Sequence, residues 1–276
     1  MQASGPRRLV VNADDFGRSH SINEAVLRAH RDGILTTASL MVTGDAAAEA
    51  VAEARRHPRL GVGLHLTLVH GRAALAPDRI HGLTDHHGDF SNNAPLAGWK
   101  YWSRADLREP LRAEIAAQFE RFRQTGLELD HVNGHLHLHL HPVVFDLLVE
   151  NAAAWGIRRM RLTRDSFPMS CRYTRGNLGY RLSHAAIFGW LSRRAAPQFH
   201  RLGWRHTQKV YGLLADGQVD EACILQLLPH LPPGDSELYS HPSLDRFRHE
   251  FDALVSPQVK AKVAELGLQL IRYQDL

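Results

Sequence analysis

The sequence predicts an α/β protein with parallel strands, built as a barrel or as a partly open relative of a barrel. Short runs of apolar and β-branched residues alternate with longer segments in which apolar residues recur every three or four positions. This alternation continues along the whole chain, as in folds whose parallel strands are joined by crossover helices. No repeat, low-complexity tract or Pro/Gly/Ser-rich linker divides the 276 residues, so we expect one domain over 1–276.

The pattern gives eight strands and eight helices in alternation. The expected strands are residues 8–12, 38–42, 61–67, 129–137, 158–163, 209–214, 236–240 and 268–273. The expected helices are residues 22–32, 45–56, 104–124, 142–155, 183–199, 219–231, 245–254 and 257–266. In such folds the carboxyl ends of the strands form the edge at which ligands bind.

Two long connections interrupt this order. Residues 70–103 are rich in Gly, His, Asp and Asn and contain four aromatic residues, a composition that predicts a loop or lid. Residues 165–205 form an insertion that combines seven arginines with aromatic residues. Long insertions in a compact domain are more often functional than not.

The composition excludes several classes of protein. Hydrophobic residues make up 44% and charged residues 22%, which excludes wholesale disorder, collagen and coiled coil. The net charge of +4 is a small excess, and no helix-turn-helix, zinc finger or RNA-binding motif accompanies it, so we expect no nucleic-acid partner. Two cysteines are too few for a disulfide framework, which favours a reducing, cytoplasmic setting. No signal peptide or apolar run of about 18 residues is visible, so we expect a soluble protein.

Two adjacent carboxylates follow the first expected strand. Residues 12–17 read Asn-Ala-Asp-Asp-Phe-Gly, so Asp14 and Asp15 stand where an apolar strand meets a glycine turn. Their place at the carboxyl end of a strand favours a role in binding or catalysis. The alternative is that the pair only solvates a turn or caps the next helix.

Histidine is the most unusual feature of the composition, with 19 residues in the chain. In residues 131–141, His alternates with Leu over its second half, which predicts a strand with imidazoles on one face. Neighbours on one face of a strand are about 6.6–7 Å apart, so two rings can reach one metal ion or line one pocket. The alternative is a half-exposed strand whose polar face happens to be histidine.

Two further histidines stand near strand ends, His65 after Gly61-Val62-Gly63-Leu64 and His241 after residues 236–240. Each alone is as well explained by a hydrogen-bonded core histidine. Together with Asp15 and one histidine of residues 135–141, however, His65 would complete a set of O and N ligands at the ends of three strands. Two histidines and one carboxylate can hold Zn²⁺ or another divalent ion and leave positions open for water and substrate.

These motifs resemble those of the YdjC-like carbohydrate deacetylases over nearly the full length. The resemblance implies an irregular (β/α) barrel of the polysaccharide-deacetylase type that removes acetyl from N-acetylated sugars with one divalent metal ion. Zn²⁺ is the favoured ion, with Mg²⁺ or another divalent ion as alternatives. Matched by position, the metal ligands are Asp15, His65 and His135, and the catalytic residues are Asp14 as base, His241 as acid and Arg161 as the residue that orients the base.

The resemblance also implies a mechanism, in which a metal-bound water is the nucleophile, Asp14 accepts its proton and His241 protonates the leaving amine. The chain departs from the family at Asn133, where Asp is common, and this leaves no second carboxylate beside His135. His137, His139 and His141 either support the site or have a structural role.

The insertion at 165–205 resembles the hopanoid biosynthesis-associated branch (HpnK) of the family. This implies a lipid-linked substrate, N-acetylglucosaminyl bacteriohopanetetrol, and the alternative is a soluble chitooligosaccharide. The insertion and the lid would then contact a membrane surface at its inner face, or else bury their aromatic residues, or stack them on sugar rings. Two other functions remain open: a non-catalytic histidine-rich metal-binding protein, and a metal-dependent hydrolase of phosphoesters or cyclic amides. The sequence leaves the oligomeric state open.

Overall fold

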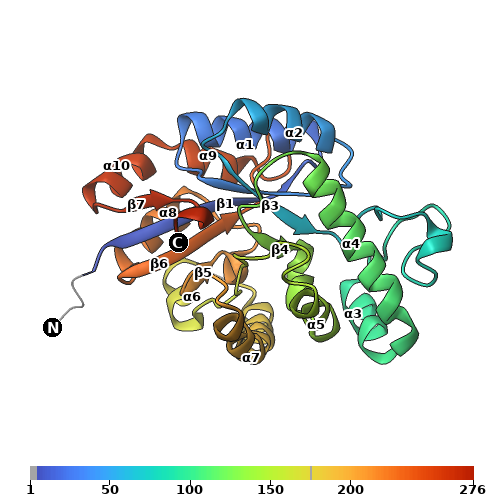
Figure 1. Cartoon of the computed structure of the whole chain (residues 1–276). Helices are drawn as coiled ribbons and strands as arrows, with labels where there is room; N and C mark the ends of the chain where they lie inside the picture. Colours follow the sequence, from blue (N-terminus) through green and yellow to red (C-terminus); the bar gives the residue numbers. More distant parts are fainter. Residues whose placement is uncertain (1–4, 175) are drawn as a thin grey trace.

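A curled parallel sheet forms the centre of the molecule, and helices surround it (Figure 1). The computed structural model describes residues 5–174 and 176–276. Within these residues the sheet has seven strands in the order β4-β3-β2-β1-β6-β5, and β7 pairs with β1. The strands are β1 (Arg7–Phe16), β2 (Thr37–Leu40), β3 (Gly61–Leu66), β4 (Val132–Gly134), β5 (Lys209–Tyr211), β6 (Gly234–Ser240) and β7 (Gln269–Ile271). This arrangement confirms the predicted α/β fold.

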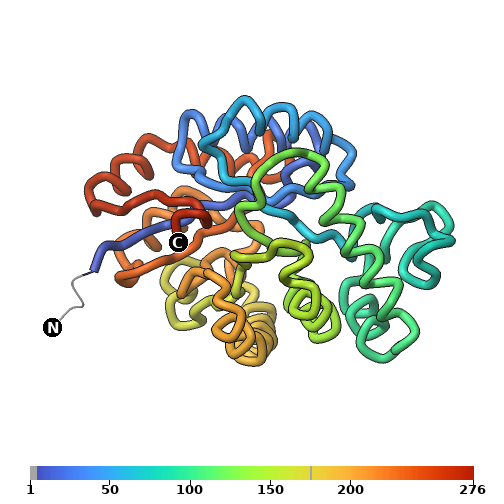
Figure 2. Tube along the Cα trace, in the orientation of Figure 1, coloured from blue at the N-terminus to red at the C-terminus, as the bar shows by residue number. Residues whose placement is uncertain are grey.

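The helices connect the strands in sequence order. The first half of the chain has α1 (His20–Asp32), α2 (Ala47–Arg56), α3 (Ala94–Ser103), α4 (Arg108–Gln124) and α5 (Pro142–Glu150). The second half has α6 (Phe167–Tyr173), α7 (Leu178–Leu202), α8 (Glu221–Leu227), α9 (Arg248–Val255) and α10 (Pro257–Glu265). In Figure 1, α1, α2 and α9 lie above the sheet and α5, α6 and α7 below it. The trace in Figure 2 shows β7, near the end of the chain, side by side with β1, with which it pairs.

The expected strand at 158–163 is not a regular strand, which corrects the count of eight. This segment is extended and makes isolated parallel bridges through Met160 to Val132 and through Arg159 to Arg205. Its backbone also accepts a hydrogen bond at Arg164 from the N–H of Val210, in β5. Residues 158–164 therefore connect the two edge strands β4 and β5 and close the curled sheet into an irregular barrel. The segment is too sparsely bonded to count as a strand, because it contacts each neighbour at only a few residues.

The histidine tract is not the long strand that its alternation predicts. β4 ends at Gly134, and residues His135–Leu140 form a 3-10 helix in which Leu136 and His137 have left-handed backbone angles, with φ of 49° and 57°. The physical reason is the neighbouring strand: β3 ends at Leu66, which pairs with Gly134, so no partner exists for a longer β4. The imidazoles consequently point in different directions instead of lining one face.

The segment 70–103 contains a helix that its composition did not predict. Helix α3 begins after Asn93, whose side chain accepts a hydrogen bond from the N–H of Leu96 and so caps the first turn. The hydroxyl of Tyr101 donates to the carbonyl of Leu68 at 2.7 Å, and this buried bond ties α3 to the end of β3. The insertion at 165–205 contains the expected helix at 183–199, but this helix, α7, is longer and spans 25 residues. A short helix that was not expected, α6, precedes it.

The buried side chain of His131 packs in the interior of the barrel below the site. Its imidazole contacts Asp130 at 2.9 Å and the hydroxyl of Ser39 at 2.9 Å. The same ring stacks on Tyr273, with 4.4 Å between the ring centres. It lies against Gly63, where a Cβ atom would stand 2.5 Å from the imidazole, so only glycine fits at that point of β3.

Candidate functional site

A distortion of β1 brings both carboxylates of the Asp14-Asp15 pair into the site. Side chains of consecutive residues in a regular strand point to opposite faces, so an undistorted β1 would separate them. The pairing of β1 with β2 shifts register between Ala13 and Phe16, and Asp15 has a left-handed φ of 65°. Asp tolerates this conformation better than most residues, and strained bulges of this kind are common next to active sites. Both carboxylates are almost completely buried.

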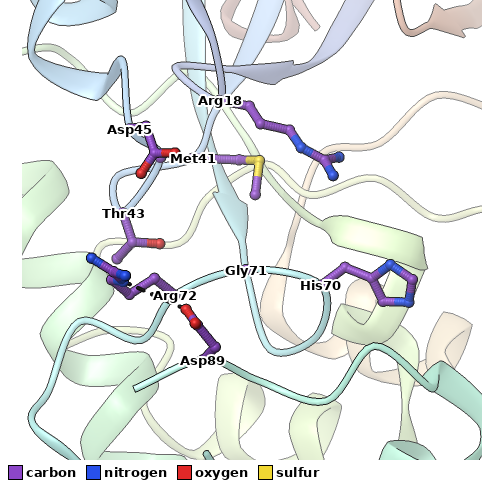
Figure 3. A pocket seen from close by; sticks show the side chains of 9 residues that line it. Arg18, Met41, Thr43, Asp45, His70, Gly71, Arg72 and Asp89 are labelled. Carbon is purple, nitrogen blue, oxygen red and sulfur yellow. Dashed lines mark hydrogen bonds and ion pairs between the residues drawn. The ribbon is translucent and has the colours of Figure 1, made fainter. Parts of the chain in front are cut away.

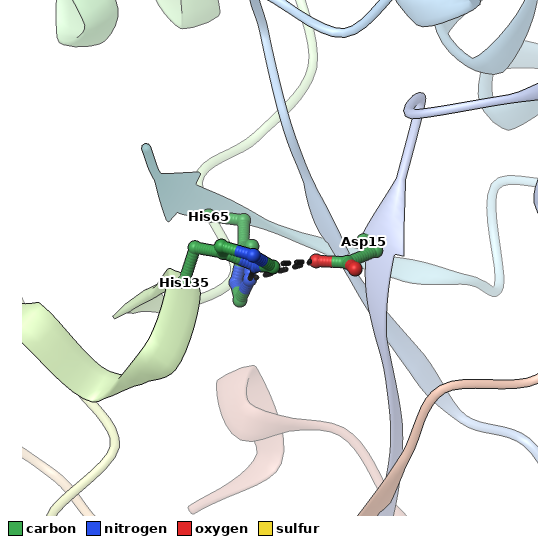
Figure 4. A group of neighbouring side chains, drawn as sticks. All are labelled: Asp15, His65 and His135. Atoms are coloured by element: carbon green, nitrogen blue, oxygen red, sulfur yellow. Dashed lines mark hydrogen bonds and ion pairs between the residues drawn. The ribbon is translucent and has the colours of Figure 1, made fainter. Parts of the chain in front are cut away.

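Asp15, His65 and His135 converge from the ends of β1, β3 and β4 (Figure 4). Oδ1 of Asp15 lies 2.8 Å from Nδ1 of His135 and 3.2 Å from Nε2 of His65. The two imidazole nitrogens are 3.4 Å apart. The structure thus brings together the three residues that the sequence predicts as ligands, although it is a 3-10 helix, not a strand, that carries His135.

The separations of these three atoms fit a single divalent ion. Ligand atoms that each lie about 2.0–2.2 Å from one Zn²⁺ are roughly 2.8–3.6 Å from one another in a tetrahedral or octahedral arrangement. The other oxygen of Asp15, Oδ2, accepts a hydrogen bond at 2.8 Å from Arg18, which leaves Oδ1 for the ion. Two nitrogens and one oxygen suit Zn²⁺ and related transition ions better than Mg²⁺, which prefers oxygen alone.

Asn133 orients His65, one of the three predicted ligands. Its Oδ1 lies 2.7 Å from Nδ1 of His65, so the imidazole donates there and presents its free Nε2 to Asp15 and His135. The amide of Asn133 donates to Oδ1 of Asp14 at 3.1 Å and to Ser39 at 2.8 Å. The residue that departs from the family pattern therefore links the ligand set to the neighbouring carboxylate.

Asp14 is held by a buried arginine. Two nitrogens of Arg161 contact its two carboxylate oxygens at 2.7 and 3.0 Å, and Asn12 donates to Oδ1 at 2.7 Å. Burial opposes ionisation of Asp14, but the charge of Arg161 outweighs it and keeps the pKa of Asp14 far below its usual range. Asp14 is therefore ionised near neutral pH.

The cage around Arg161 includes a second carboxylate that the sequence did not identify. Glu237, on β6, contacts Arg161 at 2.7 Å and accepts a hydrogen bond from the hydroxyl of Tyr273. The ring of Tyr239 lies over the guanidinium, 4.4 Å from it. Arg161 is fully buried, and these contacts leave it one orientation, with its planar edge toward Asp14. The predicted partnership of Arg161 with Asp14 is thus present in the structure.

His241 follows β6 directly. Its backbone N–H donates to Glu250 at 2.6 Å, and its Nδ1 lies 3.5 Å from the carboxylate of Asp216. Burial lowers the pKa of this imidazole, but the carboxylates of Asp15, Asp216 and Asp14 raise it more, so the pKa of His241 lies above its ordinary value. His241 can therefore hold a proton near neutral pH.

The other histidines of the tract lie outside the ligand set. Nε2 of His137 contacts the hydroxyl of Tyr239 at 2.9 Å, Nε2 of His139 the carbonyl of Arg161 at 3.0 Å, and Nε2 of His141 the carbonyl of Gly98 at 3.0 Å. Burial lowers the pKa of His139 to about 3, so this ring is neutral. Among the described residues, one group of His, Cys, Asp and Glu has the geometry of a metal site, and His135 is its only member from the tract.

Two pockets border the site. A polar pocket of about 300 Å³ includes Arg18 and His70 at one side and Arg72 with Asp89 at the other (Figure 3). Arg18 contacts Asp15, and the ring of His70 is 6.1 Å from that of His135, so this pocket adjoins the ligand set. A larger cleft of about 540 Å³ contains Asp14 and His241 at its polar end. Its other walls are mainly apolar and come from the start of α3, the 3-10 helix, α5 and α7.

Several of these residues had no signal in the sequence. Asn133 was noticed only as a departure from the family pattern, and no role was predicted for Glu237. Asp216 stands in a segment without any distinctive pattern, and Arg18 directly follows the motif at residues 12–17 without being part of it. Their roles depend on which distant residues they meet, and this becomes visible only when the strands are placed side by side.

Fold and site together define a hydrolase-like barrel with a potential metal centre at the carboxyl ends of its strands. The model of the YdjC-like protein family matches residues 8–265, and the chain belongs to that family, as the motifs indicated. A carbohydrate deacetylase of Geobacillus stearothermophilus is 30% identical over 273 residues, which cover 98% of both chains. A chitooligosaccharide deacetylase of Serratia marcescens is 30% identical over 286 residues, covering 97% of this chain and 98% of the relative.

Solved structures agree on the fold. A protein of Enterococcus faecalis described as a putative cellobiose-phosphate cleavage protein superimposes with a TM-score of 0.74 at 22% identity, over 98% of both chains. An uncharacterized protein of Agrobacterium tumefaciens gives a TM-score of 0.54 at 12% identity, over 100% of this chain and 91% of the other.

Proposed function

We propose that this protein hydrolyses the acetamide of an N-acetylglucosamine-type sugar, with one divalent metal ion as cofactor. The observation that supports this most directly is the placement of three potential metal ligands next to a buried, ionised Asp14 that also faces a substrate-sized cleft. The full-length relatives named as carbohydrate and chitooligosaccharide deacetylases support the same reaction. The reaction consumes water and gives acetate and a free amine.

The ligand set that we propose is Asp15, His65 and His135, with Zn²⁺ as the favoured ion. A divalent ion at such a site supplies a Lewis acid for the acetyl carbonyl and lowers the pKa of water toward about 7. The protein's part is to fix the geometry. Arg18 selects one oxygen of Asp15, and Asn133 selects the tautomer of His65.

Asp14 is the proposed general base. It is ionised because Arg161 lowers its pKa, and the two-point contact with Arg161 fixes its plane. It accepts the proton of the attacking water, a role that typically contributes 10²–10⁴-fold to the rate. Arg161 does not touch the substrate and acts by positioning Asp14.

His241 is the proposed general acid. Its raised pKa keeps the imidazolium populated near neutral pH, and it faces the same cleft as Asp14. It donates its proton to the sugar nitrogen as the C–N bond breaks, so the amine does not leave as a strongly basic anion. Asp216 stabilises the charged form.

For the substrate we propose a sugar with an apolar aglycone, in agreement with the hopanoid biosynthesis-associated branch and its N-acetylglucosaminyl bacteriohopanetetrol. The support is the cleft beside Asp14 and His241, whose walls include Phe188, Leu191 and Leu213. An acetyl group and a sugar ring need no apolar cavity of that size. A membrane-held substrate would place the protein in the cytoplasm at the inner face of the membrane.

Soluble chitooligosaccharides are the second candidate substrate. The polar pocket favours them, because arginine and aspartate side chains such as Arg72, Asp45 and Asp89 suit sugar hydroxyls. The relative from Serratia marcescens, which is named for this activity, supports the same choice.

The test is acetate release from a panel of N-acetylated substrates, measured together with metal content. The panel contains N-acetylglucosamine, N,N′-diacetylchitobiose and an N-acetylglucosaminide of a long-chain alcohol. We expect acetate release that needs one ion per chain, that is highest on the lipid-linked substrate, and that Asp78→Asn, an exposed control, leaves unchanged. Several bound ions with no acetate from any substrate would instead indicate metal storage.

A further inference from the structure

We propose that α3 and α7 together form a docking face for the surface of an anionic lipid bilayer. The proposal extends the proposed lipid-linked substrate, but the binding that it describes does not require the reaction. The docking face consists of large apolar side chains that are exposed in the structure: Leu96, Trp99 and Trp102 of α3, Ile187 and Trp190 of α7, and Leu136 of the 3-10 helix.

Helix α3 presents two tryptophans to solvent. Trp99 is 62% and Trp102 60% exposed, and their rings lie 5.2 Å apart. Pro95, Trp99 and Trp102 are spaced by four and three residues, so they share one side of the helix, and Pro95 lines the apolar cleft. The tryptophans therefore continue the cleft wall onto the surface. The opposite side of α3 is the one that packs on the protein, through Ala97 and Tyr101.

Helix α7 forms the other rim of the cleft. Ile187 lines the cleft and is still 52% exposed, and Trp190, three residues further, is 57% exposed. Leu136, on the 3-10 helix, lies in the same cleft wall and is 44% exposed. In Figures 1 and 2, α3, α5 and α7 lie along the same lower edge of the molecule. Exposed apolar residues thus surround the mouth of the cleft on both sides.

The segment that contains α7 carries mainly positive charge. Residues 166–215 contain seven arginines and one lysine but no Asp or Glu. Arg193, one turn beyond Trp190 on α7, is exposed, and Lys100 lies between the two tryptophans of α3. Among the described residues, neither of these two cations has a carboxylate within salt-bridge distance. Unpaired cations beside exposed tryptophans are typical of segments that lie in the headgroup region of an anionic membrane.

This charge favours a bilayer over a second copy of the chain as the occupant. A twofold dimer through the docking face would bring the same basic surface of both copies together, and their repulsion would oppose it. Anionic headgroups neutralise that surface instead. Docking would also direct the cleft mouth into the membrane surface, so the sugar of a lipid-linked substrate could reach Asp14 and His241 while its lipid stays in the bilayer.

The test is flotation of the metal-loaded protein with vesicles of phosphatidylcholine alone or of phosphatidylcholine with phosphatidylglycerol. We expect binding to the anionic vesicles that weakens with salt. The double variant Trp99→Ser/Trp102→Ser and the double variant Lys100→Glu/Arg193→Glu should each bind at least about tenfold more weakly. The matched controls Leu270→Ser, at an exposed leucine of β7, and Arg59→Glu, at an exposed arginine before β3, should bind like the original protein.

Acetate release from soluble N-acetylglucosamine, measured on the same variants, separates this proposal from the proposed function. Vesicle binding without acetate release from any substrate of the panel would overturn the function and leave the docking face intact. Acetate release without vesicle binding, or equal binding by all variants, would overturn the docking face. A dimer in solution that Trp99→Ser/Trp102→Ser dissociates would also overturn it, since the face would then belong to a second copy.

Discussion

Asn133 stands between the proposed metal ligand His65 and the proposed base Asp14, with its carbonyl oxygen 2.7 Å from Nδ1 of the imidazole. Its amide nitrogen is 3.1 Å from the carboxylate of Asp14. One side chain thus sets the tautomer of a ligand and the orientation of the base. A carboxylate at this position could accept from His65 but could not donate to Asp14.

Replacing Asn133 tests this double role. We expect Asn133→Ala to lower both metal affinity and acetate release by about 10–100-fold, as is typical when a partner of a metal-bound histidine is removed. Asn133→Asp, which introduces the residue common in the family, keeps an acceptor for His65 and should retain metal binding. Chelator competition measures the first effect and acetate release the second. Asn92→Ala, at an exposed asparagine, is the control, and equal activity in all three variants would exclude the role.

The pH dependence of the reaction should report His241. Nearby carboxylates raise its pKa, and the general acid must be protonated, so activity should persist below that pKa and be lost as pH rises through it. Asp216→Asn removes one of these charges, which lowers the pKa and should move the alkaline limb to lower pH. Asp14 stays ionised and adds no acid limb. An alkaline limb unmoved by Asp216→Asn would contradict the assignment of His241.

Stability should fall in acid because of buried neutral histidines. Burial lowers the pKa of His139 to about 3, whereas an unfolded chain has a histidine pKa of about 6.5. Between these values the unfolded state binds the extra proton, so stability present above about pH 6.5 is lost as pH falls, by up to about 1.4 kcal/mol per pH unit.

His139→Gln keeps a donor for the carbonyl of Arg161 and removes the titration. The unfolding free energy of this variant, measured by denaturant titration at several pH values, should fall less steeply between pH 6.5 and 5 than that of the original protein. Parallel pH profiles for the two proteins would show that His139 does not contribute.

The apolar cleft should affect the KM of a lipid-linked substrate and not that of N-acetylglucosamine. Leu191, on α7, is one of the apolar residues that line the cleft. We expect Leu191→Gln to raise the KM for a lipid-linked N-acetylglucosaminide about tenfold, since a polar amide would meet the apolar aglycone. The KM for N-acetylglucosamine itself should stay the same. An equal change for both substrates would argue that the cleft does not hold the aglycone.

The sequence could predict the features that depend on hydrophobic periodicity and on the order of the elements along the chain. The strands β1, β3 and β6 were expected within a few residues of their bounds, and so was the convergence of Asp15, His65 and His135, because parallel strands end at one edge. The partner of Asp14 came only from family resemblance, since nothing near Arg161 in the chain indicates a role.

The remaining features depend on non-local contacts. The turn after Gly134 overrides the strand pattern of the histidine tract because the neighbouring strand ends at Leu66. Helix α3 forms in a Gly- and Asn-rich segment because Asn93 caps it and Tyr101 anchors it to Leu68. Glu237 acquires its place only when β6 brings it against Arg161.

The most direct measurement of the central claim is acetate release by the metal-loaded protein, the chelated protein and Asp14→Asn, with metal content measured for each. The account predicts one ion per chain and acetate release for the original protein, loss of both after chelation, and recovery when the ion is returned. It predicts that Asp14→Asn keeps its ion and loses about 10²–10⁴-fold in rate. Undiminished acetate release without the ion, or near-original activity of Asp14→Asn with the ion bound, would contradict it.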